Sequence, residues 1–163
     1  MSKSKIVGMM ALIAFTMGIV LVGNAVAGEK IKCRTVYYNT KWNQVNVGDE
    51  KDHVVAMAES KGIISNKEGK TFGDGWLAWT GGLYDLGPKG PNLGDGYMTL
   101  TDKDGDKIYM KWAQKPTGSN PWTFYKGTGK FEGVKGRGTW FWTPSTDPTL
   151  FYTDWEGEVE LPR

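Results

Sequence analysis

The stretch KGTGKFEGVKGRGTW, from Lys126 to Trp140, is the first candidate for chemistry, because loops rich in glycine and basic residues often hold phosphate groups. A phosphate loop has the pattern GxxxxGK followed by Ser or Thr, and a dinucleotide loop has the pattern GxGxxG before a helix. Gly127 and Gly129 match the start of the second pattern, but Glu132 occupies the place of its third glycine. The segment then continues as TWFWT, which is typical of a strand. The glycines therefore predict tight turns between strands and no nucleotide site.

Three carboxylates in alternate positions, Asp102, Asp104 and Asp106, are the type of oxygen ligand that calcium prefers. An EF-hand loop that began at Asp102 would need glycine at its sixth position and glutamate at its twelfth. Gly105 is instead the fourth residue, and Ala113 is the twelfth. The Asp-Gly pair lies between two alternating segments, where it is a strong signal for a hairpin. We expect a turn here and no metal site.

His53 is the only histidine of the chain, which excludes a zinc site built from several histidines. In a strand, His53 and Glu59 would share a face but lie about 20 Å apart at ~3.3 Å per residue, too far for an acid–base pair. We expect His53 at the rim of the domain, with an axial haem ligand or a general base as the alternative roles. Cys33 and His53 would form a nucleophilic pair only if they met across strands, and no other residue supports such a pair. The single cysteine excludes an internal disulfide and is expected to be a small buried residue.

Alternation of apolar and polar residues recurs along the chain and predicts strands joined by turns. Residues 49–62 show weak helical periodicity, but alternation fits them as well, and we interpret them as a strand. Gly81 and Gly82 interrupt another strand and predict a bulge or bend. About eight such strands without crossover helices predict an all-β fold, an antiparallel eight-stranded barrel with a calycin-like shape. The segments are IKCRTVYY, HVVAMAES, GWLAWTGGLYDL, GYMTLTD, DKIYMKWAQ, PWTFYKG, GTWFWT and LFYTDWEGEVEL.

Residues 1–27 have the features of a signal peptide: Lys3 and Lys5, an apolar run, and Ala25-x-Ala27 as a cleavage site. A retained transmembrane anchor is the alternative, because the run is close to spanning length. Cleavage would leave residues 28–163 as one β-barrel domain in the periplasm or outside the cell. Its basic and acidic residues would number 18 each, since two of the 20 basic residues lie in the leader. This balance does not favour nucleic acid or a membrane surface as a partner.

The segment GTGKFEGVKGRGTW, preceded by DKDGDKIYMKW, resembles the paired signature of the allene oxide cyclase and dirigent-type barrels. The match covers about Gly96 to Trp142. It implies an eight-stranded antiparallel barrel with an apolar cavity, in a family of cyclases and guides of radical coupling. The cyclases use a glutamate and a tyrosine of the early strands, but IKCRTVYYNTKWNQVNVGDE offers no match, so no catalytic residue is carried over. The matched turn glycines are Gly105, Gly127, Gly129, Gly133, Gly136 and Gly138.

The eight tryptophans are the most unusual feature of the composition. Core packing must account for most of them, but rings that line a cavity would also suit a flat or apolar ligand. We expect a non-enzymatic barrel that has no cofactor and binds a small apolar or aromatic molecule. Because related barrels often assemble as trimers or dimers, a homo-oligomer is an open alternative to a monomer. A cyclase or isomerase with a buried Glu59 is one alternative, and a carbohydrate-binding module with a row of exposed rings is another. The candidate ligand-binding residues are Tyr37, His53, Met57, Glu59, Met98, Trp112, Trp140 and Trp142.

Overall fold

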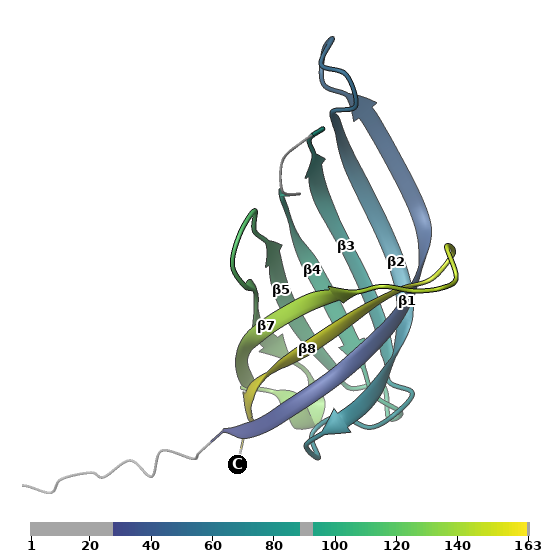
Figure 1. Ribbon diagram of the computed structural model, residues 1–163. Coiled ribbons are helices and arrows are strands. Elements are labelled where there is room, and N and C mark those ends of the chain that lie inside the picture. The colour runs from purple at the N-terminus through teal and green to yellow at the C-terminus, as the bar shows by residue number, and fades with distance from the viewer. Residues whose placement is uncertain (1–27, 89–92, 163) are drawn as a thin grey trace, which may run out of the picture.

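The computed structural model describes residues 28–88 and 93–162, and its strands form one closed antiparallel barrel in sequence order (Figure 1). The all-β eight-stranded barrel expected from the sequence is confirmed. The predicted signal peptide lies outside the described residues. The strands are β1 (Glu29–Asn46), β2 (Val54–Glu68), β3 (Leu77–Leu86), β4 (Leu93–Thr101), β5 (Lys107–Gln114), β6 (Asn120–Gly127), β7 (Lys135–Thr143) and β8 (Phe151–Glu160), with a 3₁₀ turn at Gly129–Phe131 between β6 and β7.

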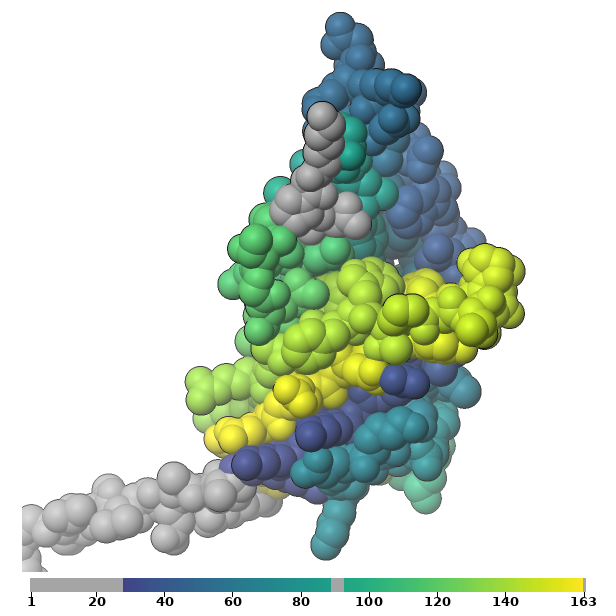
Figure 2. Space-filling view, in the orientation of Figure 1, coloured from purple at the N-terminus to yellow at the C-terminus, as the bar shows by residue number. Residues whose placement is uncertain are grey.

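The barrel is closed at one end and drawn out into an open sheet at the other. β1 pairs with β8 only from Glu29 to Tyr37, but it pairs with β2 as far as Asn46. A register shift between Asn39 and Lys41 marks a bulge where the extension begins. The β1–β2 hairpin therefore rises beyond β7 and β8, which wrap the lower part of the molecule (Figures 1 and 2). The inner face of this extension continues the inner face of the barrel.

The core follows the alternation that the sequence predicts. Ile31, Cys33, Thr35 and Tyr37 of β1 all point inward and are buried. Of residues 49–62, which the sequence predicts as a strand, those from Val54 onward belong to β2, whereas residues 49–53 form the turn before it and no helix forms. The predicted bulge at Gly81-Gly82 is wrong, because β3 keeps one regular register with both of its neighbours.

The closed end is sealed by turns that carry aromatic side chains inward. Phe72 contacts Trp76 edge-on at 5.1 Å between ring centroids, and Trp76 contacts Phe131 at 5.3 Å. Asp102 joins the β4–β5 hairpin to the 3₁₀ turn through an ion pair with Lys130. The hairpin at Asp104-Gly105 is confirmed, with Gly105 at a φ of +89°. The described residues contain no cluster of three or more metal-ligating side chains, and none of their helices is long and apolar enough to cross a membrane.

Candidate functional site

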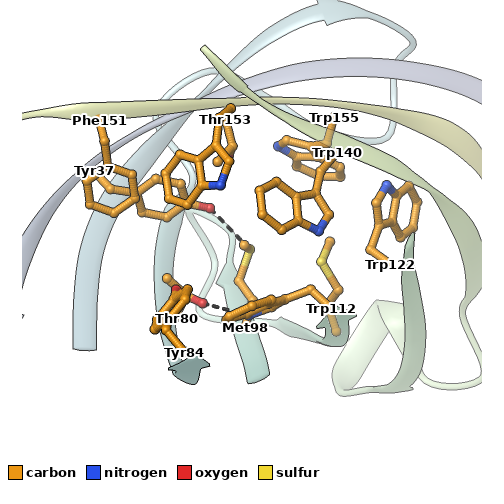
Figure 3. A pocket seen from close by; sticks show the side chains of 12 residues that line it. Tyr37, Thr80, Tyr84, Met98, Trp112, Trp122, Trp140, Phe151, Thr153 and Trp155 are labelled. Atoms are coloured by element: carbon orange, nitrogen blue, oxygen red, sulfur yellow. Dashed lines mark hydrogen bonds between the residues drawn. The ribbon is translucent and has the colours of Figure 1, made fainter. Parts of the chain in front are cut away.

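An apolar cavity lies inside the barrel below its open end (Figure 3). Its volume is about 40 Å³, measured as the space that the centre of a water molecule can reach. That is room for only a few waters. Every strand contributes to the wall except β2. The lining residues are Tyr37, Thr80, Tyr84, Met98, Met110, Trp112, Trp122, Trp140, Trp142, Phe151, Thr153 and Trp155.

Pairs of glycines hold two of the tryptophan rings flat against the wall. Gly82 of β3 lies opposite Gly96 of β4, and a Cβ on either would come within 2.5 Å of the ring of Trp112. Gly138 of β7 likewise lies opposite Gly157 of β8, and a Cβ on either would come within 2.6 Å of Trp122. The absence of a side chain at these four glycines therefore leaves the space that the two indole rings occupy.

Each cavity indole donates its N–H to another protein group. Trp112 donates to the Thr80 hydroxyl at 2.9 Å, and Trp155 donates to the Thr35 hydroxyl at 3.0 Å. Trp140 donates to a backbone carbonyl at 3.1 Å, and Trp122 to two carbonyls at 3.1 and 3.2 Å. Trp142 at the mouth makes the longest of these bonds, 3.4 Å to a glutamine side chain. The rings therefore offer their faces and edges, and not their N–H groups, to the cavity.

The polar groups of the cavity are neutral hydroxyls. Burial raises the pKa of Tyr37 to about 12, and its hydroxyl lies 3.6 Å from the sulfur of Met98. Burial also raises the pKa of Tyr84. No Asp, Glu, His, Lys or Arg belongs to the described wall. The site is therefore suited to an uncharged molecule.

An aromatic path leads from the cavity onto the inner face of the β1–β2 extension. Trp112 lies 5.5 Å from Tyr84 between ring centroids, and Tyr84 stacks with Trp42 at 6.2 Å. Trp42 is half exposed and donates its indole N–H to Gln44 at 2.7 Å. The open sheet thus forms a neutral shelf next to the cavity mouth.

The structure brings together five of the residues predicted from the sequence. Tyr37, Met98, Trp112 and Trp140 are buried in the wall, and Trp142 is half exposed at the mouth. Tyr37 stacks on Phe151 at 5.0 Å, and Trp140 meets both Trp112 and Trp142 edge-on.

Met57 and Glu59 are not part of this site, which corrects the prediction. Both point to the outside of β2, while Ala56, Ala58 and Ser60 point inward. Hydrogen bonds from Lys41 and from a neighbouring threonine lower the pKa of Glu59 to about 2. Glu59 is therefore an ionised surface carboxylate and not the buried acid that a cyclase would need.

His53 lies at the rim of the domain, as expected, and away from the cavity. Its ring bridges two carboxylates, with Nδ1 2.7 Å from Glu50 and Nε2 2.6 Å from Asp85. These hydrogen bonds, first that of Glu50 and then that of Asp85, raise the pKa of His53. Cys33 is buried opposite Asn66 at the other end of β2, so the two residues form no nucleophilic pair.

The sequence prediction missed several wall residues of β3, β5, β6 and β8. Phe151 and Trp155 lie on the apolar face of a segment whose other face is acidic, so alternation alone would have identified them. Tyr84 was hidden by the predicted bulge, because a shift at Gly81-Gly82 would have moved it to the outer face. The other missed residues are Thr80, Met110, Trp122 and Thr153.

Comparisons with known proteins bear on the fold. No protein-family model matches the sequence, and no curated protein matches it. Among solved structures, a pterocarpan synthase dirigent protein is similar with a TM-score of 0.50 and 12% identity, over 81% of this chain and 91% of that chain. The fold is that of the dirigent-type barrels. A pyocyanin demethylase is also similar, with a TM-score of 0.44 and 16% identity, over 79% of this chain and 99% of that chain. At such low identity the likeness shows a dirigent-type fold alone.

Proposed function

We propose that this dirigent-type barrel is exported and binds a small, neutral, apolar or aromatic molecule at the open end of its cavity, without converting it chemically. The observation that carries the proposal is the composition of the cavity wall. Its indole rings already donate their N–H groups to protein acceptors, its polar groups are neutral hydroxyls, and none of its described residues is charged. Such a wall gives a large contact area to an apolar ring and desolvates no charge.

The small volume of the cavity favours a ligand that binds at the mouth. A space of about 40 Å³ is far below the roughly 300–1,000 Å³ of sites for drug-sized ligands. Trp142 is the half-exposed ring of the wall, and its indole makes the longest hydrogen bond. Displacement of this ring by a ligand ring would replace one aromatic contact with another and open the cavity.

Two alternative functions receive less support. A cyclase that works through a buried carboxylate would need an acid in the wall, but Glu59 lies outside the barrel. A carbohydrate-binding module would need a flat row of exposed rings. The ring of the exposed Tyr125 instead meets the exposed Tyr97 at 77° and the half-buried Tyr109 at 50°. A tilted cluster of this kind makes a poor platform for a sugar chain.

The test uses two probes that share one ring system, 1-naphthol as the neutral probe and 1-naphthoate as the anionic one. Binding is followed by quenching of tryptophan fluorescence. We expect 1-naphthol to bind at least about tenfold more tightly, because burial of an unpaired carboxylate is costly. Trp142→Ala should change the affinity for 1-naphthol, whereas Phe141→Ala should not, because Phe141 is equally exposed but faces outward. Equal binding of both probes, or no effect of Trp142→Ala, would contradict the proposed site.

Native mass spectrometry would identify the natural ligand. The protein is expressed from its full sequence in an exporting host and purified without detergent. An extra mass that is lost on denaturation would be the ligand. The same spectrum tests export, because removal of the leader after Ala27 predicts a chain that begins at Gly28. A chain that keeps its first 27 residues in the membrane fraction would refute the export part of the proposal.

A further inference from the structure

The inner face of the β1–β2 extension begins where the cavity wall ends. Tyr37 of β1 belongs to the wall, and the inward side chains that follow it on the same strand are Asn39, Trp42 and Gln44. We call these three the shelf residues. They lie on the part of β1 that extends beyond its pairing with β8, so the shelf is open above and continuous with the mouth of the cavity (Figure 1).

A β-bulge decides which side chains of β1 reach the shelf. Strict alternation beyond Asn39 would turn Lys41 inward and Trp42 outward. The register shift at this point instead leaves Thr40 and Lys41 both outside, where each makes a hydrogen bond to Glu59. One extra residue therefore replaces a cation on the inner face with an indole. Bulges that redirect a side chain in this way are frequent beside active sites.

Trp42 provides an aromatic surface that is only partly covered. The facing positions of β2 are Ala56 and Ala58, which are buried although the sheet is open here, so the indole lies close to the sheet. Tyr84 stacks against the indole with 25° between the ring planes. Trp42 is still 44% exposed, so part of its ring remains free to contact a ligand.

Two side-chain amides border this ring. The amide oxygen of Gln44 accepts the indole N–H of Trp42 at 2.7 Å, and that of Asn39 accepts the hydroxyl of Ser60 at 2.8 Å. Since each oxygen already has a protein donor, each amide has its NH2 group left to offer a ligand. Both amide residues are exposed. The shelf thus combines an aromatic ring with hydrogen-bond donors that carry no charge.

We propose that the shelf binds an uncharged, hydroxylated part of the ligand, of the size of one hexose ring, while the apolar ring of the same molecule occupies the mouth. The inference rests on the proposed function, because it concerns the other end of the same ligand. A pyranose ring has an apolar face of C–H groups that can stack on Trp42, and its oxygen atoms can accept hydrogen bonds from Asn39 and Gln44. The ligand class is then a neutral aromatic glycoside.

Two other kinds of ligand end fit the shelf less well. A second aromatic ring would also stack on Trp42, but it would cover the two amide groups without giving them an acceptor, which is costly. A sugar acid would bring a carboxylate to a surface without a cation, because the described inward positions of the extension hold no lysine or arginine and Lys41 points outside.

Isothermal titration calorimetry with 1-naphthol, 1-naphthyl β-D-glucoside and 1-naphthyl β-D-glucuronide tests the inference. We expect the glucoside to bind at least about fivefold more tightly than 1-naphthol, because it adds stacking and hydrogen bonds. The glucuronide should bind at least about fivefold more weakly than the glucoside. If 1-naphthol binds and the glucoside binds no more tightly than 1-naphthol or the glucuronide, this inference is overturned and the proposed function stands. If neither 1-naphthol nor the glucoside binds, both are refuted.

Trp42→Ala assigns the gain in affinity to the shelf. This variant should weaken binding of the glucoside at least about fivefold and change the affinity for 1-naphthol less than about twofold. Trp42→Phe should keep most of the gain, because a ring can still stack. Phe141→Ala is the matched control, since Phe141 is 45% exposed and lies outside the barrel. Equal losses for both probes in Trp42→Ala would overturn the inference, because the indole would then act only on the mouth.

Gln44→Leu separates hydrogen bonding from stacking. Leucine has a similar size but no donor, so the glucoside should bind about fivefold more weakly, the effect of one lost hydrogen bond. The matched control is Asn43→Leu, because Asn43 is the neighbouring amide and points to the outside opposite Met57. Binding of 1-naphthol should be retained in both variants, which shows that they are folded. Equal effects of Gln44→Leu and Asn43→Leu on the glucoside would contradict the assignment.

Discussion

At the scale of the residue, glycine and tryptophan act together inside the barrel. Gly82 and Gly96 leave room for the ring of Trp112, and Gly138 and Gly157 leave room for Trp122. Glycine weakens a strand by roughly 0.5–1 kcal/mol relative to alanine, so four such positions are a cost. The cost is offset by rings that pack face-on against the backbone and keep one orientation.

The neighbouring residues Gly81 and Gly82 allow a test of this packing. Gly82→Ala would place a methyl group 2.4 Å from the ring of Trp112, and we expect a loss of roughly 2–3 kcal/mol in the free energy of unfolding. Gly81→Ala faces outward into open space and should be neutral or stabilising by about 0.5 kcal/mol. Urea unfolding measures both. Equal losses would mean that strand propensity, and not contact with Trp112, decides the cost.

The sequence predicted the wall where large apolar residues alternate with polar ones, as at Met98, Trp112 and Trp140. It failed on β2, where Met57 faces outward and Ala58 faces inward. The space inside β2 is taken by large rings from β1 and β3, so only small side chains fit there. The usual rule that the larger residues face the core is therefore reversed on this strand.

At the scale of the element, the β1–β2 extension is fastened at its tip by His53. The ring bridges Glu50 of the tip and Asp85 of β3, so both ring nitrogens face carboxylates. The fold thus favours the protonated ring, and the pKa lies above 6.5. The stabilisation is fully present below pH ~6.5, the unfolded value, and is lost as the pH rises through the higher folded pKa.

A proton NMR titration of the imidazole measures this pKa directly, because the chain has one histidine. We expect a value above 6.5 in the wild type. Glu50→Gln should lower it, because the first of the two carboxylate contacts is lost, and Asp85→Asn should lower it as well. Glu156→Gln is the control, since Glu156 is a surface carboxylate of β8. A wild-type pKa at or below 6.5 would show that the bridge does not form in solution.

The extension itself could not be predicted from the sequence. Residues 38–46 are exposed on both faces except for contacts such as the one between Trp42 and Tyr84, so they carry no apolar alternation. These residues form a strand because they pair with β2, and this contact with a distant part of the chain is not visible in their own sequence. The closed-end turn at Asp104-Gly105 was predictable because the turn chemistry is local.

At the scale of the whole molecule, the pairing of β1 with β8 turns a meander into a closed unit. Nine residue pairs join the two strands, from Glu29 with Val159 to Tyr37 with Phe151. The sequence predicted closure from the number of strands and from the resemblance to a barrel family, and no single residue signals it. In the closed part of the barrel, neither β1 nor β8 has a free edge from which it can fray, so we expect the strands around the seam to open together.

Cys33 reports on this seam, because it lies in β1 opposite Trp155 of β8. Burial, and then the nearby Asp74, raise the pKa of the thiol to about 12, so the native thiol should be inert to a disulfide reagent. We expect labelling to require unfolding of the whole barrel. Its rate should then give a free energy of opening within about 1 kcal/mol of that from urea unfolding. A much smaller free energy of opening would mean that β1 and β8 separate locally, and that the seam, in addition to the mouth at Trp142, is a route into the cavity.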